Sequence, residues 1–227
     1  MDERDTKPPE KQWRQGMTRA IMGIVAAIAV AAAMPVAAQN TAGPRVPLVQ
    51  DDSTDPDVQA AFKELRARGT EPLNLHRVYN NAPKLARASL AMAQALRDGA
   101  VVSRADRELI ILRATQLARG DYQFGQHRRL AMSCGISAEQ IDSLPQWRGS
   151  NLFSDRQRAV LAYADAMASA EGVDDATFDA MKAFYSTQEI IELTMNAAYY
   201  SASSQISRTL RITADGNPKG GGYGTCR

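Results

Sequence analysis

The sequence predicts an all-α domain of about eight helices. Apolar residues recur at three- and four-residue spacing, and most of these segments begin at a residue type that caps helices. No run of residues alternates β-branched with polar side chains between turn residues, so strands have little support. Of the 227 residues 44% are hydrophobic and 23% are charged, which is typical of a globular protein. The length suits one domain with additional terminal segments.

An uncharged, apolar run precedes the helical region. It covers residues 20–38, follows Arg19 and ends in small residues. A charged lead, an apolar centre and a small-residue exit are typical of a secretory signal peptide. We therefore predict that residues 1–38 are removed, with Met17 as the true start, and that the mature protein is periplasmic or secreted. An alternative stays open, in which the uncleaved run anchors the protein in a membrane.

The charge and cysteine content exclude several classes of protein. Lys and Arg number 27 against 25 Asp and Glu, so the chain lacks the basic excess of a nucleic-acid-binding protein. Two cysteines cannot build a disulfide-rich scaffold or a four-thiolate zinc site. Export would allow Cys134 and Cys226 to pair. The position of Cys226 near the end of a Gly-rich tail instead favours a buried Cys134 and an unpaired tail cysteine.

The chain divides into a lead segment (39–54), a helical domain (55–212) and a Gly-rich tail (213–227) that we expect to be disordered. The periodicity predicts helices over residues 55–68, 82–97, 103–118, 121–134, 137–143, 154–170, 174–185 and 187–211. Four of them begin with a serine followed three positions later by an acid or amide, the capping-box pattern. These pairs are Ser103 and Asp106, Ser137 and Gln140, Ser154 and Gln157, and Ser186 and Glu189.

The stretch from residue 107 to 137 is the most informative for chemistry. Glu108 lies early in one predicted helix, whereas Gln123 and His127 share one face of the next because they are four residues apart. Between these helices we expect Gly120 to adopt the left-handed conformation and Asp121 to act as an N-cap. The short link predicts an antiparallel helical hairpin.

Two structural interpretations compete with a catalytic one. An isolated histidine such as His127 is more often a structural or surface residue than a catalyst. Arg104 and Glu108 are four residues apart, so Glu108 could form a salt bridge on a helix surface. The chain has only two histidines, and we assign no role to His76, which we place at the start of a loop or short helix. Any imidazole chemistry would then run through His127.

These residues resemble the carboxymuconolactone decarboxylase and alkyl hydroperoxidase D superfamily. The resemblance rests on Arg107-Glu108-Leu109-Ile110, on His127 nineteen positions after Glu108, and on Ala131, Gly135 and Ser137. It covers roughly residues 55–212. It implies an alkyl hydroperoxidase D-like helical fold and assembly of the chain as a homo-oligomer, a trimer or hexamer.

The thiol enzymes of this superfamily carry two cysteines between the glutamate and the histidine. Those positions fall on Gly120 and Gln123 here, so both thiols are absent. A thiolate at a helix N-terminus is stabilised by the unpaired amides and the helix dipole, and neither Gly nor Gln can replace it. Cys134 lies near the far end of the predicted helix, where the dipole disfavours a thiolate. Peroxiredoxin activity is therefore the disfavoured alternative.

The decarboxylase branch also lacks the cysteines and keeps the glutamate and histidine. The resemblance implies a lyase that acts on a small carboxylated or lactone substrate without a metal or organic cofactor. His127 would be the general acid/base and Glu108 its partner, which fixes the imidazole tautomer. Gln123 would orient the substrate, and either Arg128 or Arg129 would hold a substrate carboxylate.

The last predicted helix adds a polar stripe at helical spacing, from which Asn196 and Tyr199 are further candidates for substrate binding; Glu192 and Ser203 complete it. That stripe could equally face water. A non-catalytic oligomeric binding protein on the same scaffold also remains open. The resemblance implies a step in the breakdown of aromatic rings, which is normally cytoplasmic in this family. The predicted export does not fit this location, so the sequence leaves the substrate undefined.

Overall fold

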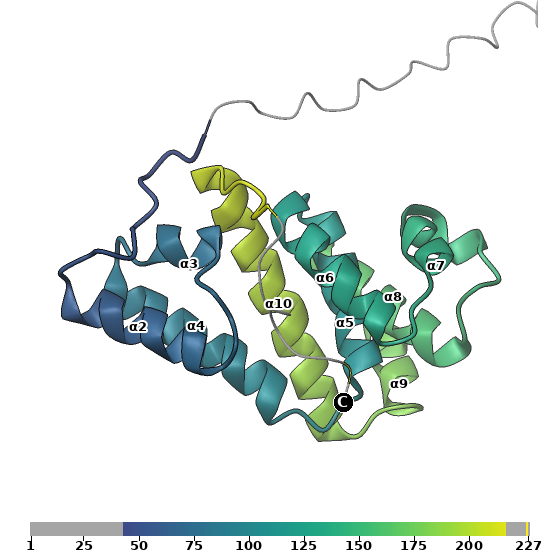
Figure 1. The fold of residues 1–227 in the computed structure, drawn as a ribbon. Helices are drawn as coiled ribbons and strands as arrows, with labels where there is room; N and C mark the ends of the chain where they lie inside the picture. Colours follow the sequence, from purple (N-terminus) through teal and green to yellow (C-terminus); the bar gives the residue numbers. More distant parts are fainter. Residues whose placement is uncertain (1–42, 217–225, 227) are drawn as a thin grey trace, which may run out of the picture. The chain divides into compact units, whose positions relative to one another are not determined.

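The computed structural model describes residues 43–216 and Cys226, and this part of the chain is helical without strands (Figure 1). The elements are α2 (Pro56–Ala67), α3 (Asn74–Tyr79), α4 (Pro83–Asp98), α5 (Arg104–Leu117), α6 (Asp121–Ser133), α7 (Ala138–Asp142), the 3-10 helix η1 (Leu144–Gly149), α8 (Asp155–Ala168), α9 (Asp175–Lys182) and α10 (Thr187–Leu210). The predicted leader or anchor and most of the tail lie outside the described residues. None of the described helices is long and apolar enough to span a bilayer.

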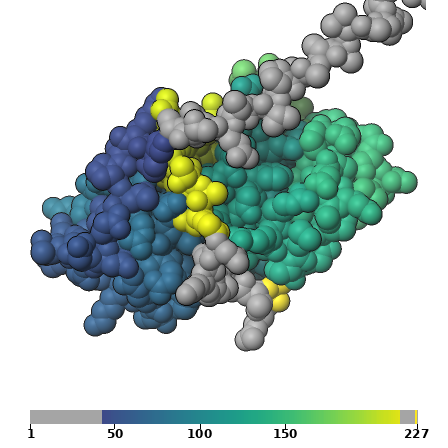
Figure 2. All heavy atoms as spheres, turned by 45° about the horizontal axis from the view of Figure 1, so that its top comes forward, coloured from purple at the N-terminus to yellow at the C-terminus, as the bar shows by residue number. Residues whose placement is uncertain are grey.

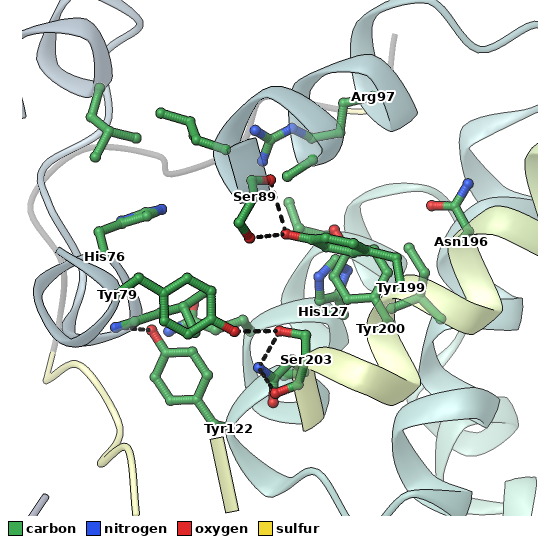
Figure 3. A pocket seen from close by; sticks show the side chains of 18 of the residues that line it. His76, Tyr79, Ser89, Arg97, Tyr122, His127, Asn196, Tyr199, Tyr200 and Ser203 are labelled. Atoms are coloured by element: carbon green, nitrogen blue, oxygen red, sulfur yellow. Dashed lines mark hydrogen bonds between the residues drawn. The ribbon is translucent and has the colours of Figure 1, made fainter. Parts of the chain in front are cut away.

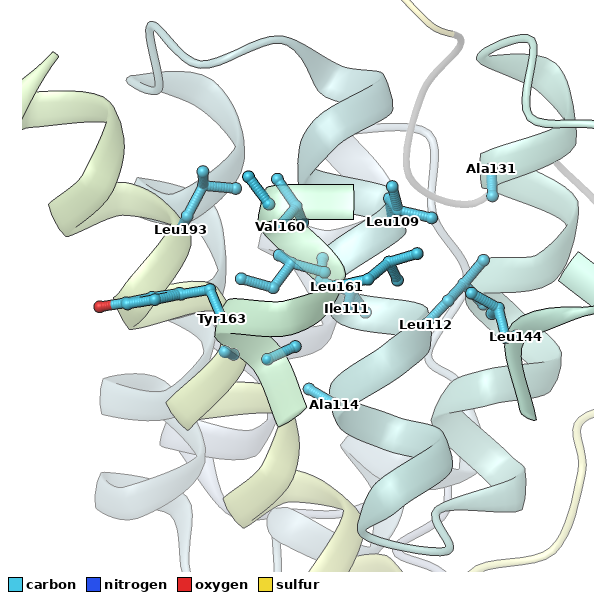
Figure 4. Close-up of a cluster of buried hydrophobic side chains, with 14 of the residues drawn as sticks. Leu109, Ile111, Leu112, Ala114, Ala131, Leu144, Val160, Leu161, Tyr163 and Leu193 are labelled. Carbon is cyan, nitrogen blue, oxygen red and sulfur yellow. The ribbon is translucent and has the colours of Figure 1, made fainter. Parts of the chain in front are cut away.

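Helix α5 is the centre of the main hydrophobic core. It packs against α6, α8 and α10, and Leu109, Ile110 and Leu112 are almost fully buried between them. Leu161 from α8 and Leu193 from α10 complete the same cluster (Figure 4). Because α5 is covered on nearly all sides, even charged side chains in its first turns are carried into the interior.

Helices α2 and α4 form a smaller apolar cluster of their own. Val58, Phe62 and Leu65 of α2 are buried there, with Leu90 of α4 packed against them. Helix α3 contacts α4, and α4 in turn contacts α10. Figure 1 shows α2–α4 on one side of α10 and α5–α9 on the other. The helices on either side of α10 provide two walls for the site described below.

The predicted helix starts are confirmed at all four serines. Ser137, Ser154 and Ser186 form full capping boxes, in which the serine oxygen accepts an amide hydrogen and the later side chain accepts from the cap. Ser103 accepts from the Asp106 amide in the same way. These starts were readable because each cap is local in the sequence.

The sequence did not predict α3 and η1 as helices. Helix α3 begins after Leu73, which offers no hydroxyl or carboxylate for a cap. The imidazole Nδ1 of His76, the third helical residue, accepts the Leu73 amide hydrogen at 3.0 Å, as the third residue does in a capping box. Histidine is not one of the usual capping residues, so the sequence carries no recognisable start signal here.

The link between α5 and α6 differs from expectation. Arg119, with φ of 54°, is the left-handed residue, and Gly120 has φ of −94°. Gly120 is also the N-cap of α6, whereas Asp121 is its first helical residue. A Cβ at position 120 would lie 2.1 Å from Oγ of Ser204, so glycine is needed for the close approach of α10 rather than for its φ.

The expectation of unpaired cysteines is wrong. Cys134 and Cys226 form a disulfide across 92 positions of sequence. Cys134 is the C-cap residue of α6 and is half-buried rather than buried. The chain beyond α10 returns to α6, since Asp215 accepts hydrogen bonds from Tyr122 and Gln126. The disulfide is a second contact of this terminal segment with α6.

Candidate active site

A cavity that is partly open to solvent lies among α2, α3, α4, α5, α6 and α10. Apolar side chains such as Leu65, Leu90 and Leu130 line part of it. Four tyrosines and both histidines of the sequence also reach it (Figure 3). A mostly apolar hollow with a few converging polar groups is typical of a small-molecule site.

Glu108 and His127 meet inside this cavity. Oε2 of Glu108, in the first turns of α5, lies 2.7 Å from Nδ1 of His127 on α6. The two residues are 1% and 7% exposed. A carboxylate only accepts hydrogen bonds, so Nδ1 carries the proton and Nε2 is the nitrogen that a ligand can reach. The ring of Tyr200 packs edge-on against the imidazole, with 4.5 Å between centroids.

Arg104 holds the other oxygen of the same carboxylate. Its Nε donates to Oε1 of Glu108 at 2.6 Å, so the salt bridge anticipated for a helix surface exists but is buried. Burial raises the pKa of Glu108, and the charges and hydrogen bonds of His127 and Arg104 more than reverse this, so its pKa is lowered. Glu108 is therefore an ionised carboxylate that fixes the orientation of His127.

Gln123 lies one helical turn before His127, is 3% exposed and lines the cavity. Its Nε2 donates to the backbone oxygen of Ser203 at 3.2 Å and to the hydroxyls of Ser203 and Ser207 at 2.9 and 2.6 Å. The expected shared face of Gln123 and His127 is thus present in the structure.

Asn196 and Tyr199 of α10 also line the cavity. Nδ2 of Asn196 donates to the Glu192 backbone oxygen at 2.8 Å. The Tyr199 hydroxyl lies 2.9 Å from the hydroxyl of Ser89 and donates to its backbone oxygen at 3.2 Å, which ties α10 to α4. Burial, partly offset by the Ser89 hydrogen bond and the charge of Arg97, raises the pKa of Tyr199.

Two expectations about polar residues are wrong. Arg128 is not among the cavity residues; it pairs with Asp142 at 2.7 Å, and its side chain is 34% exposed. Arg129 is exposed. The next two positions of a helix point about 100° and 200° away from His127, which explains both outcomes. Glu192 belongs to the predicted stripe, yet its carboxylate accepts the amide hydrogens of Val101 and Val102 instead.

Sequence reasoning missed the basic wall of the cavity. Arg97, Arg104 and Arg107 line it from the end of α4 and the start of α5. Arg107 is 6% exposed and donates to the backbone oxygens of Leu96 and Arg97. The four-residue spacing from Arg104 to Glu108 was the one available signal, and the same spacing is also typical of a salt bridge on a helix surface.

His76 is a second missed residue of the site. It lines the cavity from α3, and its pKa is lowered to about 4 by burial and by the nearby charges of Arg97 and Arg77. Its Nδ1 accepts from the Leu73 amide, so the neutral ring carries its proton on Nε2. Figure 3 shows the ring directed toward the side chains across the cavity.

Neither position that carries a thiol in the related thiol enzymes can do so here. The first, Gly120, is closed by Ser204, and the second is the buried amide of Gln123. Both cysteines of the sequence are joined in the disulfide. Among the described residues no three His, Cys, Asp or Glu side chains gather as metal ligands would.

Comparison with known proteins agrees with this geometry. Residues 83–166 match the model of the carboxymuconolactone decarboxylase family. The uncharacterized protein YnjA of Escherichia coli (strain K12) is 32% identical over 81 residues, which are 35% of this chain and 44% of that protein. The match therefore spans less than half of the curated relative.

Solved structures share the fold at low sequence identity. An uncharacterized peroxidase-related protein from Silicibacter sp. TM1040 is 16% identical, with a TM-score of 0.66 over 81% of this chain and 96% of that one. An alkylhydroperoxidase AhpD core protein from Ralstonia eutropha JMP134 is 19% identical, with a TM-score of 0.66 over 76% and 92%. The debrominase Bmp8 is 18% identical, with a TM-score of 0.62 over 78% and 93%. Residues 83–166 thus match the carboxymuconolactone decarboxylase family, and the described part of the chain shares its fold with alkylhydroperoxidase D-like structures.

Proposed function

We propose that this protein is an exported enzyme that uses His127 to transfer a proton to or from a small carboxylated or lactone substrate. The observation that carries the proposal is the 2.7 Å contact between Nδ1 of His127 and Oε2 of Glu108 inside a cavity. A buried carboxylate that orients an imidazole toward an enclosed space is a common arrangement for general acid/base catalysis.

The chemistry follows from what each group can donate. When a carboxylate on the carbon adjacent to a carbonyl group leaves as CO₂, the electron pair of the broken carbon–carbon bond moves into the carbonyl system as an enolate. A protonated Nε2 of His127 then delivers its proton to carbon and is reprotonated from water. Glu108 stabilises the charged imidazole, as its lowered pKa indicates. The resemblance supports a reaction of this kind without a cofactor.

The side chains that line the cavity favour a substrate that is small, partly apolar and negatively charged. Arg97, Arg104 and Arg107 contribute positive charge, whereas Tyr79, Tyr199 and Tyr200 contribute aromatic surface. The debrominase Bmp8, which shares the fold, has been solved as a C82A variant with 2,3,4-tribromopyrrole. That complex supports a compact ring as a suitable occupant for this scaffold.

The direct test is turnover of carboxylated lactones and β-keto carboxylates by the purified protein, with organic hydroperoxides assayed in parallel. We expect CO₂ release by the wild type and its loss in His127→Ala. A surface variant, Glu171→Gln, controls for handling, since that residue is exposed. Turnover that is unchanged in His127→Ala would refute the role of His127, whereas the absence of any turnover would leave a binding protein as the remaining function.

An assay of hydroperoxide reduction would distinguish the proposed enzyme from the second candidate, a thiol peroxidase. The disulfide between Cys134 and Cys226 leaves no free thiol in the chain, and Cys134 does not line the cavity. We therefore expect no thiol-dependent peroxidase activity. Hydroperoxide reduction that disappears in Cys134→Ser would overturn this part of the proposal.

Export is proposed from the apolar run at residues 20–38 and is supported by the disulfide. Disulfides persist in oxidising compartments such as the bacterial periplasm and are rare in the cytosol. A phosphatase reporter that is active only after export, fused behind the full chain, would test the location. Extraction with carbonate would then separate a cleaved leader from an anchor, because only an anchored protein stays with the membrane.

Self-association is also proposed. Leu85, Val101 and Ile191 are large apolar side chains with exposed fractions of 72%, 60% and 58%. They lie on α4, after α4 and on α10, and α4 and α10 are in contact. A second copy of the chain could cover such apolar surface. Sedimentation equilibrium of the wild type and of Ile191→Glu would show whether an oligomer forms and whether this surface holds it.

A further inference from the structure

We propose that the cavity selects a hydroxylated carboxylate and that Gln123 recognises the hydroxyl group of this substrate. The inference deepens the proposed function and rests on it for the choice of cavity. The inference concerns what the cavity binds. It can therefore be wrong even if His127 is catalytic, and it can be correct even if no turnover is found.

The first observation is an acceptor without a partner on Gln123. The Ser203 backbone oxygen can only accept, so the group that points to it must be the Nε2 amide of Gln123. This fixes the orientation of the side chain, and Oε1 is left on the other side. Oε1 is buried and has no hydrogen-bond partner among the described residues.

Asn80 repeats the arrangement from another wall. Its Nδ2 donates to the backbone oxygen of His76 at 2.8 Å, which again fixes the orientation of the amide. Its Oδ1 is buried and has no partner within the described part of the chain. Asn80 is 4% exposed, ends α3 and lines the same cavity as Gln123 on α6. Two residues from different helices therefore line one cavity, and each has a buried acceptor without a partner among the described residues.

These acceptors determine which ligands the cavity can hold tightly. Both acceptors are buried and have no hydrogen-bond partner among the described residues. A bound ligand whose hydroxyl group reaches one of them supplies the missing donor. A ligand without a donor leaves a buried acceptor unsatisfied, which weakens binding by about five- to a hundredfold for each group.

The same reasoning separates two kinds of carboxylated substrate. An ionised carboxylate and a lactone offer only acceptors, so they can interact with the arginines but not with Oε1 of Gln123. A hydroxyl or enol group supplies the missing donor. Gln123 precedes His127 by one helical turn, about 6 Å along the axis, so the hydroxyl would lie close to the reacting carbon. A donor-free lactone is thus the poorer substrate.

Calorimetric binding of three small acids tests the inference: benzoate, 3-hydroxybenzoate and 3,4-dihydroxybenzoate. They share the carboxylate and the flat ring and differ in the number of hydroxyl groups. We expect wild-type protein to bind at least one hydroxylated acid about tenfold or more tightly than benzoate. In Gln123→Met, which removes the acceptor with little change in volume, this ratio should fall by the same factor.

Gln126→Met is the matched control. Gln126 lies on the same helix and lines the cavity, but its amide is bonded on both sides, to Asp215 and Arg129. Its replacement should leave the ratio of the two affinities unchanged. Benzoate should bind Gln123→Met at least as well as wild type, and that gain would also show that the variant is folded.

The results of these binding experiments can be told apart from a failure of the proposed catalytic function. Equal affinity for hydroxylated and plain benzoate in the wild type would overturn the inference, and so would a preference that survives in Gln123→Met. Failure of every hydroxylated acid to bind would overturn it as well. A preference that depends on Gln123 and persists in His127→Asn would uphold the inference whether or not turnover is found.

Discussion

A side-chain carbon at Gly120 would lie 2.1 Å from Oγ and 2.4 Å from Cβ of Ser204. Real side chains do not approach this closely, so α6 begins against α10 only because position 120 is glycine. The contact spans 84 positions of sequence and sets the distance between the helix that carries His127 and the helix that carries Tyr199 and Tyr200.

We predict that Gly120→Ala destabilises the fold by about 1–3 kcal/mol, the usual effect of overpacking a tight contact. Ser204→Gly removes the opposing side chain. The double variant Gly120→Ala/Ser204→Gly should therefore recover most of the stability that Gly120→Ala loses. Urea unfolding of the four proteins, followed by circular dichroism, measures the coupling. If Gly120→Ala is as stable as wild type, the close approach does not constrain the hairpin.

Glu108→Gln should lower the rate of turnover by about a hundredfold or more, within the range ascribed to general acid/base groups. The amide removes the negative charge that orients and stabilises the His127 imidazole, and it also leaves Arg104 without its carboxylate. Steady-state kinetics beside Glu171→Gln would measure this effect. Because Glu108 is buried, a melting curve must show that the variant is folded at the assay temperature.

Local features of the fold could be predicted from the sequence, and long-range ones could not. The serine caps of α5, α7, α8 and α10 depend on residues three positions apart, so their pattern is visible in the chain. The need for glycine at position 120 depends on Ser204, and the cap of α3 depends on an imidazole. Neither relationship leaves a signal in neighbouring residues.

In the candidate site, too, local features could be predicted from the sequence and long-range ones could not. The shared face of Gln123 and His127 follows from helical spacing, and the family resemblance singled out Glu108. Which arginine reaches the cavity depends on how the helices are rotated in the packed structure, so Arg128 was chosen in place of Arg104. The paired cysteines were missed because they are 92 positions apart, so no pattern in neighbouring residues indicates the pairing.

The stability of the protein should fall as the pH drops from about 6.5 toward 4. The folded protein holds His76 with a pKa of about 4, compared with an ordinary value of 6.5. In this interval the unfolded chain therefore binds a proton that the folded chain does not, and the free energy of unfolding decreases with falling pH. His76→Asn should flatten this dependence, since Asn cannot be protonated and can still accept from the Leu73 amide.

Urea midpoints at pH 7 and pH 5 would test this dependence. Glu108 contributes little to the difference, because its carboxyl is ionised in the folded chain and, with an ordinary pKa of 4.5, mostly ionised in the unfolded chain at pH 5. A wild-type midpoint that is equal at both values, or a decrease that is equally large in His76→Asn, would contradict the assignment of the effect to His76.

Arg97→Gln should raise KM for a carboxylated substrate by about ten- to a hundredfold and leave kcat almost unchanged. Arg97 lines the cavity, and a charge-assisted hydrogen bond contributes about 1.5–3 kcal/mol to binding. Such a bond is made equally in the bound substrate and in the transition state, so its loss affects KM. Arg128→Gln is the control, because Arg128 pairs with Asp142 outside the cavity and should leave both constants unchanged. The assignment of the basic wall would be wrong if Arg128→Gln, rather than Arg97→Gln, weakened binding.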